Sequence, residues 1–366
     1  MNSVRIDRIR GALAAAVTAG GGGLDGLLVM SPHNRMYMTG FTGSSGYVLL
    51  AREHALLLTD FRYVVQAATE APCFEVIRHA SPYRVTLAAE VGARGISRLG
   101  FEAEHVSVAE HRRLEVELPG VTLVPTEGLL EQLRLVKDRN EIERIATAVD
   151  CSDKAFAEVL AIGAIKPGAT ELSVAAALES AMRRGGSTRP AFDTIVASGP
   201  RSALPHGRAS GRVICAGDLV TMDFGATVDG YCSDITRTVI VGEASAEQRR
   251  IYDLVLAAQL AGVDAVRAGR TGCAVDAVAR EIIAAAGHAE HFGHGLGHGV
   301  GLAVHEGPRL STVGADDPLV PGMVTSVEPG VYIPGWGGVR IEDLVVVTQD
   351  GCQVLTKAPK QLVEVR

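Results

Sequence analysis

Short apolar runs alternate with helical spacings along the first third of the chain. Apolar residues at positions 6, 9, 13 and 17 follow one helical face, which predicts an amphipathic helix over residues 4–19. The run GYVLLAREHALLLTDF predicts two strands joined by a polar turn at Arg52 to His54. Helical patterns separate the remaining strands, so we expect an α/β domain. Those strands lie near LLVM, CFEVIR, RLGFE and VTLVP.

A long helical stretch connects this domain to the rest of the chain. The spacing is helical over residues 128–162, with a break expected at the polar residues KDRN. Pro167-Gly168 then ends the stretch. A chain of 366 residues exceeds the roughly 250–300 residues that one core usually holds. We therefore expect a first domain over 1–127 and a second over 128–366.

The second domain groups its helices between clusters of strands. Helices are predicted at ELSVAAALESAMRRGG and over about 245–267 and 273–287. This grouping is typical of an α+β domain. The predicted strands are FDTIVAS, the stretch LVTMDFGATVDGYCSDITRTVIV, and VTSVEPGVYI, VRIEDLVVVT and CQVLT near the end of the chain.

Composition and charge exclude several classes of protein. The net charge of −7 argues against a nucleic-acid binder that relies on a broad basic surface. The six cysteines show no CxxC spacing, so we expect neither a thiolate zinc site nor a disulfide framework, and a cytoplasmic location fits best. No apolar run reaches the roughly 20 residues that span a bilayer. A signal peptide is the alternative for residues 4–19, although Asp7 interrupts its basic part.

Two aspartates lie in the strand-like runs of MDFGATVDGYCSDITRT. Asp229-Gly230 is a favoured two-residue hairpin turn, and this loop pairs Thr236 with Asp223. Asp234 then points to the same face as Asp223. Two converging carboxylates repel unless a cation lies between them or one is protonated. The alternative is a pair of exposed hairpin acids.

Histidines gather in HAEHFGHGLGHGVGLAVHE, which holds five of the eleven, at positions 288, 291, 294, 298 and 305. Its alternating glycines exclude a stable helix, so a metal or a tight turn against a sheet must order it. Clustered neutral imidazoles are natural metal ligands, although the zinc motif HExxH is absent. An ordinary surface or core position remains the alternative for any single histidine.

Two glutamates lie in strand contexts near the end of the chain. Glu328 lies in TSVEPGVYI, where an ionised side chain among Val, Pro and Gly is costly without a partner. Glu342 lies in GVRIEDLVVV. The alternative for both glutamates is a position on an exposed sheet edge without a functional role. Aspartate, glutamate and histidine ligands suit a pair of divalent ions such as Mn²⁺, Mg²⁺ or Co²⁺ better than a thiolate site.

The order and setting of these candidates resemble the pita-bread metallopeptidases, which include methionine aminopeptidase, aminopeptidase P, prolidase and creatinase. GHGLGHGVGLAVHE is similar to the stretch HxxxHxxGxxxHE of the Xaa-Pro peptidases. NRMYMTGFTGSSGYVLL and LLTDFRYVVQA resemble the N-terminal domain that methionine aminopeptidases lack, and EPGVYIPGWGGVRIED is typical of the proline-directed branch. The resemblance implies an α/β creatinase-like domain followed by an α+β pita-bread catalytic domain.

The resemblance also implies a dinuclear metal site. Manganese is the favoured ion, with cobalt, magnesium or zinc as alternatives. Two such cations lower the pKa of a bridging water to near neutrality and so generate the hydroxide that attacks a peptide carbonyl. Glu328 would also carry the proton from that water to the leaving amine. The five ligands implied are Asp223, Asp234, His298, Glu328 and Glu342.

Other residues match the family's substrate-handling positions. By resemblance, His305 and His206 would polarise the carbonyl oxygen or stabilise the tetrahedral intermediate. His294, Tyr332 and Arg340 would line the pocket around the proline ring and the downstream chain. His206 is counted with the substrate-binding residues as well as with the catalytic ones.

The activity implied is hydrolysis of Xaa-Pro peptide bonds by a metal-dependent exopeptidase. We favour aminopeptidase P-like activity on longer peptides over a strict Xaa-Pro dipeptidase, or prolidase. A non-catalytic member and a metal-free creatinase-like enzyme are the alternatives, and the presence of all five ligands argues against both. We expect a proline-containing peptide as substrate, no nucleic-acid or membrane partner, and a homodimer or homotetramer whose first domain helps to close the active site.

Overall fold

The structure is a computed structural model that describes residues 2–15 and 23–366. Contacts along the chain divide it into two units, Met1–Arg134 and Leu135–Arg366. The division falls at the end of helix α6 (Leu129–Leu135), a few residues beyond the expected boundary after residue 127. Each unit is described by itself below.

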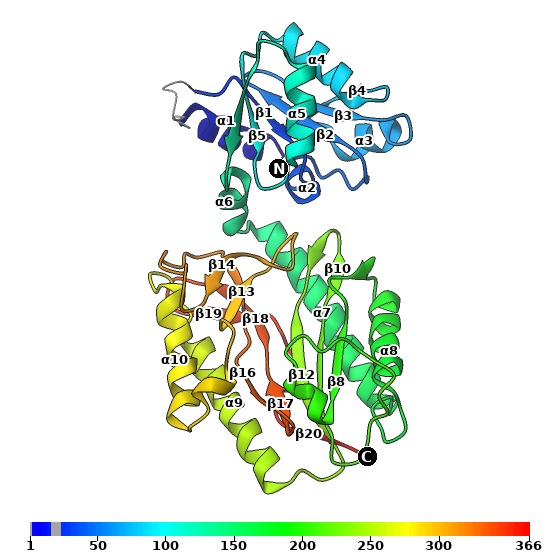
Figure 1. The fold of residues 1–366 in the computed structure, drawn as a ribbon, viewed down its shortest axis with the longest axis vertical. Coiled ribbons are helices and arrows are strands. Elements are labelled where there is room, and N and C mark those ends of the chain that lie inside the picture. The colour runs from blue at the N-terminus through cyan, green and yellow to red at the C-terminus, as the bar shows by residue number, and fades with distance from the viewer. Residues whose placement is uncertain (1, 16–22) are drawn as a thin grey trace. The chain divides into compact units, whose positions relative to one another are not determined.

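The first unit is an α/β domain built on a mixed sheet. In the described part of this unit, the sheet has six strands in the order β4-β3-β2-β1-β5-β6. β1 is fully buried and runs parallel to β5 but antiparallel to β2. Every strand predicted here is present (Figure 1). Its elements are α1 (Asn2–Ala15), β1 (Gly26–Val29), α2 (Pro32–Thr39), β2 (Tyr47–Ala51), β3 (Ala55–Thr59), α3 (Val64–Glu70), β4 (Glu75–Arg78), α4 (Tyr83–Ala93), β5 (Arg98–Glu102), α5 (Val108–Glu117) and β6 (Thr122–Thr126).

Helix α1 is the amphipathic helix that the spacing predicts. Ile6, Ile9 and Leu13 are buried, which confirms the apolar face as far as Leu13. The fourth predicted position, Val17, lies outside the described residues. Within the described residues, no helix has the length and apolar character needed to cross a membrane.

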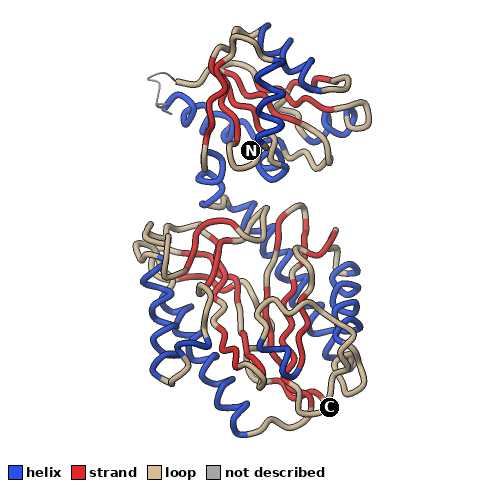
Figure 2. Tube along the Cα trace, viewed as in Figure 1, coloured by secondary structure: helices blue, strands red, loops and turns tan. Residues whose placement is uncertain are grey.

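The second unit holds two helix pairs with strands between them, as Figures 1 and 2 show. Helices α7 and α8 bury one apolar core against β8, β9 and β12. Helices α9 and α10 bury a second core against the strands near the end of the chain. The helices are α7 (Arg139–Ala161), α8 (Glu171–Arg184), α9 (Ala246–Ala265) and α10 (Gly272–Ala285), with 3-10 turns η1 (Gly199–Ala203) and η2 (Ala289–His291).

The strands of the second unit form several small sheets. One described sheet has the order β20-β12-β9-β8 and another β14-β13-β15-β18-β19. The strands are β7 (Arg189–Pro190), β8 (Ile195–Ser198), β9 (Leu219–Phe224), β10 (Ala226–Val228), β11 (Tyr231–Cys232), β12 (Ile235–Val241), β13 (Gly297–Gly299), β14 (Glu306–Leu310), β15 (Val324–Val327), β16 (Gly330–Ile333), β17 (Gly337–Arg340), β18 (Asp343–Val347), β19 (Cys352–Val354) and β20 (Val363–Val365).

Capping residues explain where the long helices of this unit begin. The break expected at KDRN is confirmed, because α6 ends at Leu135 and α7 begins at Arg139. Asp138 caps α7 by accepting a hydrogen bond from the backbone of Glu141, whose carboxylate bonds back to the Asp138 backbone. A similar capping box at Thr170 starts α8.

The hairpin between β9 and β12 has the predicted register. Asp229 and Gly230 both have positive φ angles, 47° and 81°, as the tight turn requires. Thr236 pairs with Asp223, and the pairing continues along both strands without a register shift. The parity argument is therefore confirmed, and it sets the direction of every side chain on this ribbon.

The glycine-rich histidine stretch is ordered by a sheet. Residues 297–299 form β13, which lies between β14 and β15. A Cβ atom on Gly297 would lie 2.0 Å from the Ser326 carbonyl oxygen, and one on Gly299 would lie 1.9 Å from that of Gly307. Side chains at these positions would push the strands apart, so the alternating glycines allow the close approach.

Candidate metal centre

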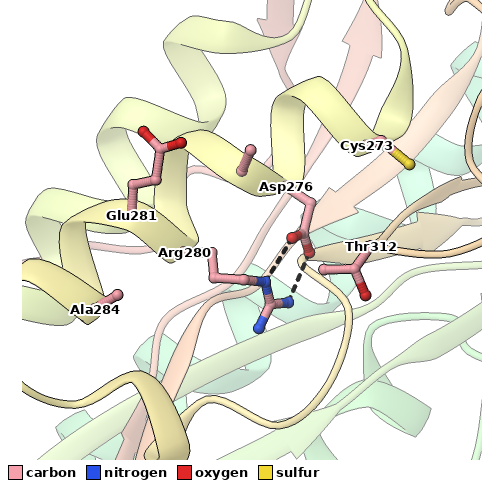
Figure 3. A pocket seen from close by; sticks show the side chains of 7 residues that line it. Cys273, Asp276, Arg280, Glu281, Ala284 and Thr312 are labelled. Carbon is pink, nitrogen blue, oxygen red and sulfur yellow. Dashed lines mark hydrogen bonds and ion pairs between the residues drawn. The ribbon is translucent and has the colours of Figure 1, made fainter.

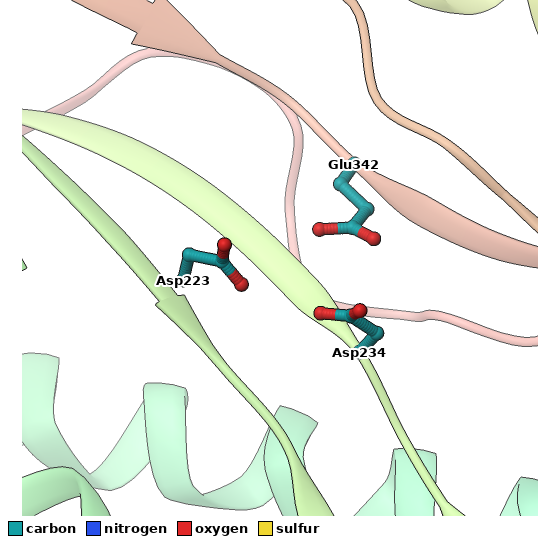
Figure 4. A group of neighbouring side chains, drawn as sticks. All are labelled: Asp223, Asp234 and Glu342. Atoms are coloured by element: carbon teal, nitrogen blue, oxygen red, sulfur yellow. The ribbon is translucent and has the colours of Figure 1, made fainter. Parts of the chain in front are cut away.

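Three carboxylates converge at the point where the two halves of the second unit meet (Figure 4). Asp223 lies on β9, Asp234 directly precedes β12, and Glu342 lies between β17 and β18. One oxygen from each carboxylate lies within 4.8 Å of the others. The Glu342 amide also donates to the Thr236 carbonyl, at 3.2 Å, which ties the second half to the hairpin.

The chemistry of this cluster fits divalent cations. Oδ1 of Asp223, Oδ1 of Asp234 and Oε1 of Glu342 are buried and have no hydrogen-bond partner among the described residues. Burial, and then the charges of Glu342 and Asp223, raise the pKa of Asp234 well above its usual range. Burial likewise raises the pKa of Glu342, and nearby carboxylates add to the effect. A cation would satisfy these oxygens and offset their repulsion.

His298 and Glu328 complete the cluster from the second half. Nε2 of His298 lies 3.6 Å from Asp234 Oδ2 and 3.3 Å from Glu328 Oε1. Nδ1 of His298 lies 3.1 Å from the Gly299 carbonyl, which can only accept, so this nitrogen carries the hydrogen. Nε2 is thereby left to face the carboxylates, as in a metal-ligating histidine oriented by its own backbone.

His298 and Glu328 shift each other's pKa in opposite directions. Burial alone would lower the pKa of His298, but the hydrogen bond and charge of Glu328 outweigh it and raise the pKa to about 9. Burial alone would raise the pKa of Glu328, but His298 lowers it below the usual range. These opposite shifts show that Glu328 places negative charge against Nε2 of His298.

Two hydroxyls support the candidate ligands. Thr236 Oγ1 donates to Glu342 Oε2 at 2.8 Å. Ser326 Oγ donates to Glu328 Oε1 at 3.0 Å and accepts from the His298 amide at 3.0 Å. Sequence reasoning missed both residues. The two-residue period of a strand would have found them, because Thr236 follows Asp234 by two positions and Ser326 precedes Glu328 by two.

A chain of hydrogen bonds links the predicted pocket residues to Asp223. His294 Nδ1 donates to the Gly295 carbonyl at 2.7 Å, so its Nε2 accepts from the Tyr332 hydroxyl at 2.9 Å. Arg340 donates to that hydroxyl at 2.8 Å and to Asp223 Oδ2 at 2.7 Å. Arg340 is only 3% exposed and also donates to Thr236 and Pro205. These contacts favour a role for Arg340 in holding Asp223 in place.

His305 and His206 are two exposed histidines, and His305 lies beside a candidate ligand. The His305 ring lies 4.3 Å from the His298 ring, centroid to centroid. Burial lowers the pKa of His305, and the charges of His298 and His206 lower it further. Burial also lowers the pKa of His294, with a smaller contribution from His206. His206 follows η1 and is exposed, and its charge lowers the pKa of both His305 and His294.

An ion pair on α10 holds the start of the histidine stretch (Figure 3). Arg280 donates twice to Asp276, at 2.7 and 2.9 Å, and also to the carbonyls of Phe292 and His294. Asp276 accepts from the Leu296 amide at 2.9 Å. Sequence reasoning missed this ion pair. Asp276 and Arg280 line an open pocket of about 350 Å³. The lining of that pocket includes none of the candidate ligands.

Fold and cluster together define a class of two-domain metal-dependent hydrolases. The profile of metallopeptidase family M24 matches residues 143–349, and that of the creatinase/prolidase N-terminal domain matches residues 5–136. The chain belongs to metallopeptidase family M24. The predicted family and the predicted fold class, an α/β creatinase-like domain plus an α+β pita-bread domain, are both confirmed.

Relatives and solved structures agree over nearly the whole chain. The chain is 46% identical over 341 residues to the uncharacterized peptidase YqhT of Bacillus subtilis (strain 168), covering 93% of this chain and 96% of that protein. An Xaa-Pro dipeptidase from Bacillus anthracis matches with a TM-score of 0.94 and 46% identity, over 99% of both chains. An X-Pro aminopeptidase from Thermotoga maritima MSB8 matches with a TM-score of 0.91 and 41% identity, also over 99% of both.

Proposed function

We propose that this metallopeptidase hydrolyses Xaa-Pro peptide bonds with the help of two divalent cations. The observation that carries the proposal is the group of three buried carboxylate oxygens without partners, on Asp223, Asp234 and Glu342. His298 and Glu328 are the other two proposed ligands, since both face the same cluster. The names of the similar structures, a dipeptidase and an aminopeptidase that act on Xaa-Pro or X-Pro bonds, support the choice of substrate.

The cations would supply Lewis acidity, which lowers the pKa of water at the site so that hydroxide is available near neutral pH. Side chains of the protein would carry out the proton transfer. Oε1 of Glu328 bonds to Ser326 and faces His298, so we assign the proton transfer to Oε2. Oε2 accepts a proton from the attacking water. It then donates this proton to the proline nitrogen, which must gain one when the C–N bond of the peptide breaks.

Histidines handle the rest of the substrate in this proposal. His305 and His206 face the cluster from its exposed side, where a substrate carbonyl oxygen would acquire negative charge, and imidazole N–H groups stabilise such charge. His294 and Tyr332 present a ring edge and a hydroxyl bonded to each other, a rigid wall suited to a proline ring. Arg340 stabilises that wall and Asp223 together.

Manganese remains the ion that we propose, with cobalt, magnesium and zinc as alternatives, because the ligands are oxygen-rich with one imidazole. We further propose a cytoplasmic homodimer or homotetramer that acts on proline-containing peptides. Activity on peptides longer than two residues also remains a prediction, since the names of the similar structures include both a dipeptidase and an aminopeptidase.

The test is an assay on purified protein stripped with a chelator and supplied with or without Mn²⁺. Substrates are an Xaa-Pro dipeptide, an Xaa-Pro-Yaa tripeptide and an Xaa-Ala-Yaa control. We expect hydrolysis of the proline peptides only, restored by the metal. Absence of metal-restored hydrolysis of both proline peptides would overturn the proposal. Cleavage of the dipeptide without the tripeptide would define a prolidase, and cleavage of the tripeptide an aminopeptidase P-like enzyme.

A further inference from the structure

A buried glutamate at the start of α8 accepts hydrogen bonds from three residues. Glu171 is fully buried, with 0% of its surface exposed. Its Oε1 accepts from the amide and from the hydroxyl of Ser198, both at 2.8 Å. Its Oε2 accepts from the amide of Ser210 at 3.1 Å and from the hydroxyl of Ser210 at 2.6 Å. Arg201 Nε donates to both oxygens, at 3.3 and 3.2 Å, and supplies the counter-charge that a buried carboxylate needs.

All of these donors lie in residues 198–210, which we call the His206 loop. The two serines begin and end this loop, and the first of them is also the last residue of β8. Within the loop, Arg201 Nη2 donates to the Arg208 carbonyl at 2.7 Å. Both ends of the loop therefore meet at one carboxylate, and His206 lies between those ends.

The backbone at the start of α8 is fixed independently of the Glu171 side chain. The capping box at Thr170 begins the helix. The Glu171 amide donates to the Arg212 carbonyl at 3.1 Å, and the Leu172 amide donates to the Ser210 carbonyl at 3.0 Å. The carboxylate therefore projects from a helix start that keeps its own hydrogen bonds when the side chain is changed.

Other contacts support the middle of the His206 loop. Arg340 donates to the Pro205 carbonyl at 3.1 Å, and Arg208 forms a bridge with β8. These contacts hold the residues on either side of His206, whereas Glu171 holds the two ends. We propose that Glu171 is a positioning residue that fixes His206 by joining the ends of the His206 loop. This inference rests on the proposed function only for the role of His206 in turnover.

The His206 loop needs a carboxylate at this position, because each oxygen of Glu171 accepts from a backbone amide, one from Ser198 and the other from Ser210. A backbone amide can only donate. In Glu171→Gln the NH2 group therefore meets one of these amides, whichever way the glutamine is turned, and one end of the loop is released. Arg201 also loses its buried counter-charge. His206 should then change position, whereas the hairpin of β9 and β12 keeps its own pairing.

The test compares Glu171→Gln with Asp153→Asn. Asp153, on α7, also accepts from two backbone amides, those of Lys357 at 2.8 Å and Ala358 at 3.0 Å, which lie outside the His206 loop. For Glu171→Gln we expect kcat on a proline peptide to fall roughly 30-fold, with KM within about threefold, because a catalytic group is displaced while the middle of its loop stays supported. Bound metal should be unchanged. Asp153→Asn should keep kcat within about threefold of wild type.

A double-mutant cycle separates positioning from general damage. His206→Ala removes the group that Glu171 is proposed to position. In that background Glu171→Gln should lower kcat by less than about threefold, because coupled residues are not additive. If the two losses multiply instead, Glu171 does not act through His206 and the positioning role is overturned. A loss in Glu171→Gln no greater than in Asp153→Asn would overturn it as well.

A readout that needs no turnover keeps this proposal separate from the proposed function. Imidazole NMR signals of His206 in the metal-free protein, assigned by their loss in His206→Ala, should shift in Glu171→Gln and stay in place in Asp153→Asn. Ser210→Ala removes one donor at the end of the loop and should shift them less; it is the variant to measure if Glu171→Gln does not fold. Wild-type protein without proline-peptide hydrolysis would refute the proposed function and leave this measurement standing. Unchanged His206 signals would refute the positioning role even in an active enzyme.

Discussion

Glu342 and Asp343 are neighbours in the sequence, both are buried, and their carboxylates have opposite surroundings. Asp343 accepts from Arg237 at 2.8 Å, from Gln259 at 3.0 Å and from Lys360 at 2.7 Å, so both of its oxygens are satisfied. Glu342 accepts from Thr236 on one oxygen, and the other has no partner among the described residues. Burial is common to both, so the number of donors is what separates a structural carboxylate from a candidate ligand.

The alternation of β12 creates this difference. Thr236 points to the carboxylate cluster, and the next residue, Arg237, points to the opposite side, where it meets Asp343. Asp343 is therefore paired with two cations, Arg237 and Lys360. The other side gathers Asp223, Asp234, Glu342 and Glu328, and among the described residues their ion pairs come from Arg340 and His298. This excess of negative charge is what a pair of divalent cations would neutralise.

The largest effect is expected on the cluster side. Asp234→Asn should reduce turnover to less than about a thousandth of wild type, a rise in barrier of about 4 kcal/mol, because an amide is a poor ligand for a hard cation. His298→Ala should do the same. The metal-free variant Asp234→Asn should melt no lower than metal-free wild type, because it removes a carboxylate that repels its neighbours. Near-normal turnover in either variant would contradict the ligand assignment.

On the side of Asp343, whose oxygens are all hydrogen-bonded, loss of the carboxylate should destabilise the fold. Asp343→Ala leaves Arg237 buried without its counter-charge, and breaking such a pair costs about 3–5 kcal/mol. Urea unfolding of the metal-free protein measures this loss. Its matched control is Asp234→Asn in the same buffer. Equal stability of the two variants would mean that donor number does not distinguish the two carboxylates.

Metal binding should stabilise the protein only through the carboxylate cluster of Asp223, Asp234 and Glu342. At an ion concentration of 100 times Kd, one site adds about 2.7 kcal/mol to the free energy of unfolding. Differential scanning calorimetry with Mn²⁺ and with chelator should show this gain in wild type and in Asp343→Ala. Asp234→Asn should lose most of it. A gain of equal size in Asp234→Asn would place the ions elsewhere.

The sequence could predict the local features that bring Asp223 and Asp234 together. The parity of Asp223 and Asp234 follows from a two-residue turn and a two-residue period, and the structure has that register. The strands and helices around it follow from spacing in the same way. The histidine stretch and the two glutamates were also candidates from their own sequence contexts, and the family resemblance added His206, Tyr332 and Arg340. In the structure His298 pairs with Glu328, and His294 bonds to Tyr332.

Contacts between distant segments could not be predicted from one sequence. The bond from Arg340 to Asp223 joins residues 117 positions apart, and it turns an expected pocket residue into a support for a candidate ligand. The ion pair of Lys137 with Glu306 joins residues 169 positions apart. The strand β13 has no alternating apolar pattern, because its glycines serve backbone approach to β14 and β15. Such partners become visible only when the chain is folded.

Asp25, in the first unit, is a satisfied carboxylate near the surface and should show the smallest effect. It accepts from the Ser97 hydroxyl at 2.7 Å and from the amides of Ser97 and Arg98. The Ser97 hydrogen bond chiefly lowers the pKa of Asp25, although partial burial opposes it. A carboxyl whose pKa is lower in the folded state stabilises the protein above its unfolded pKa, near 3.9.

Asp25→Asn should therefore lose about 1 kcal/mol of stability at pH 7, the scale of a hydrogen bond to a charged group that is partly solvated. The loss should shrink as the pH falls below about 4, because wild type then protonates Asp25 and gives up the same contribution. Urea unfolding at pH 7 and pH 3 measures both values. A difference that stays constant down to pH 3 would show that the charge of Asp25 contributes nothing, and that donors stabilise a carboxylate only where water is excluded, as at Asp343.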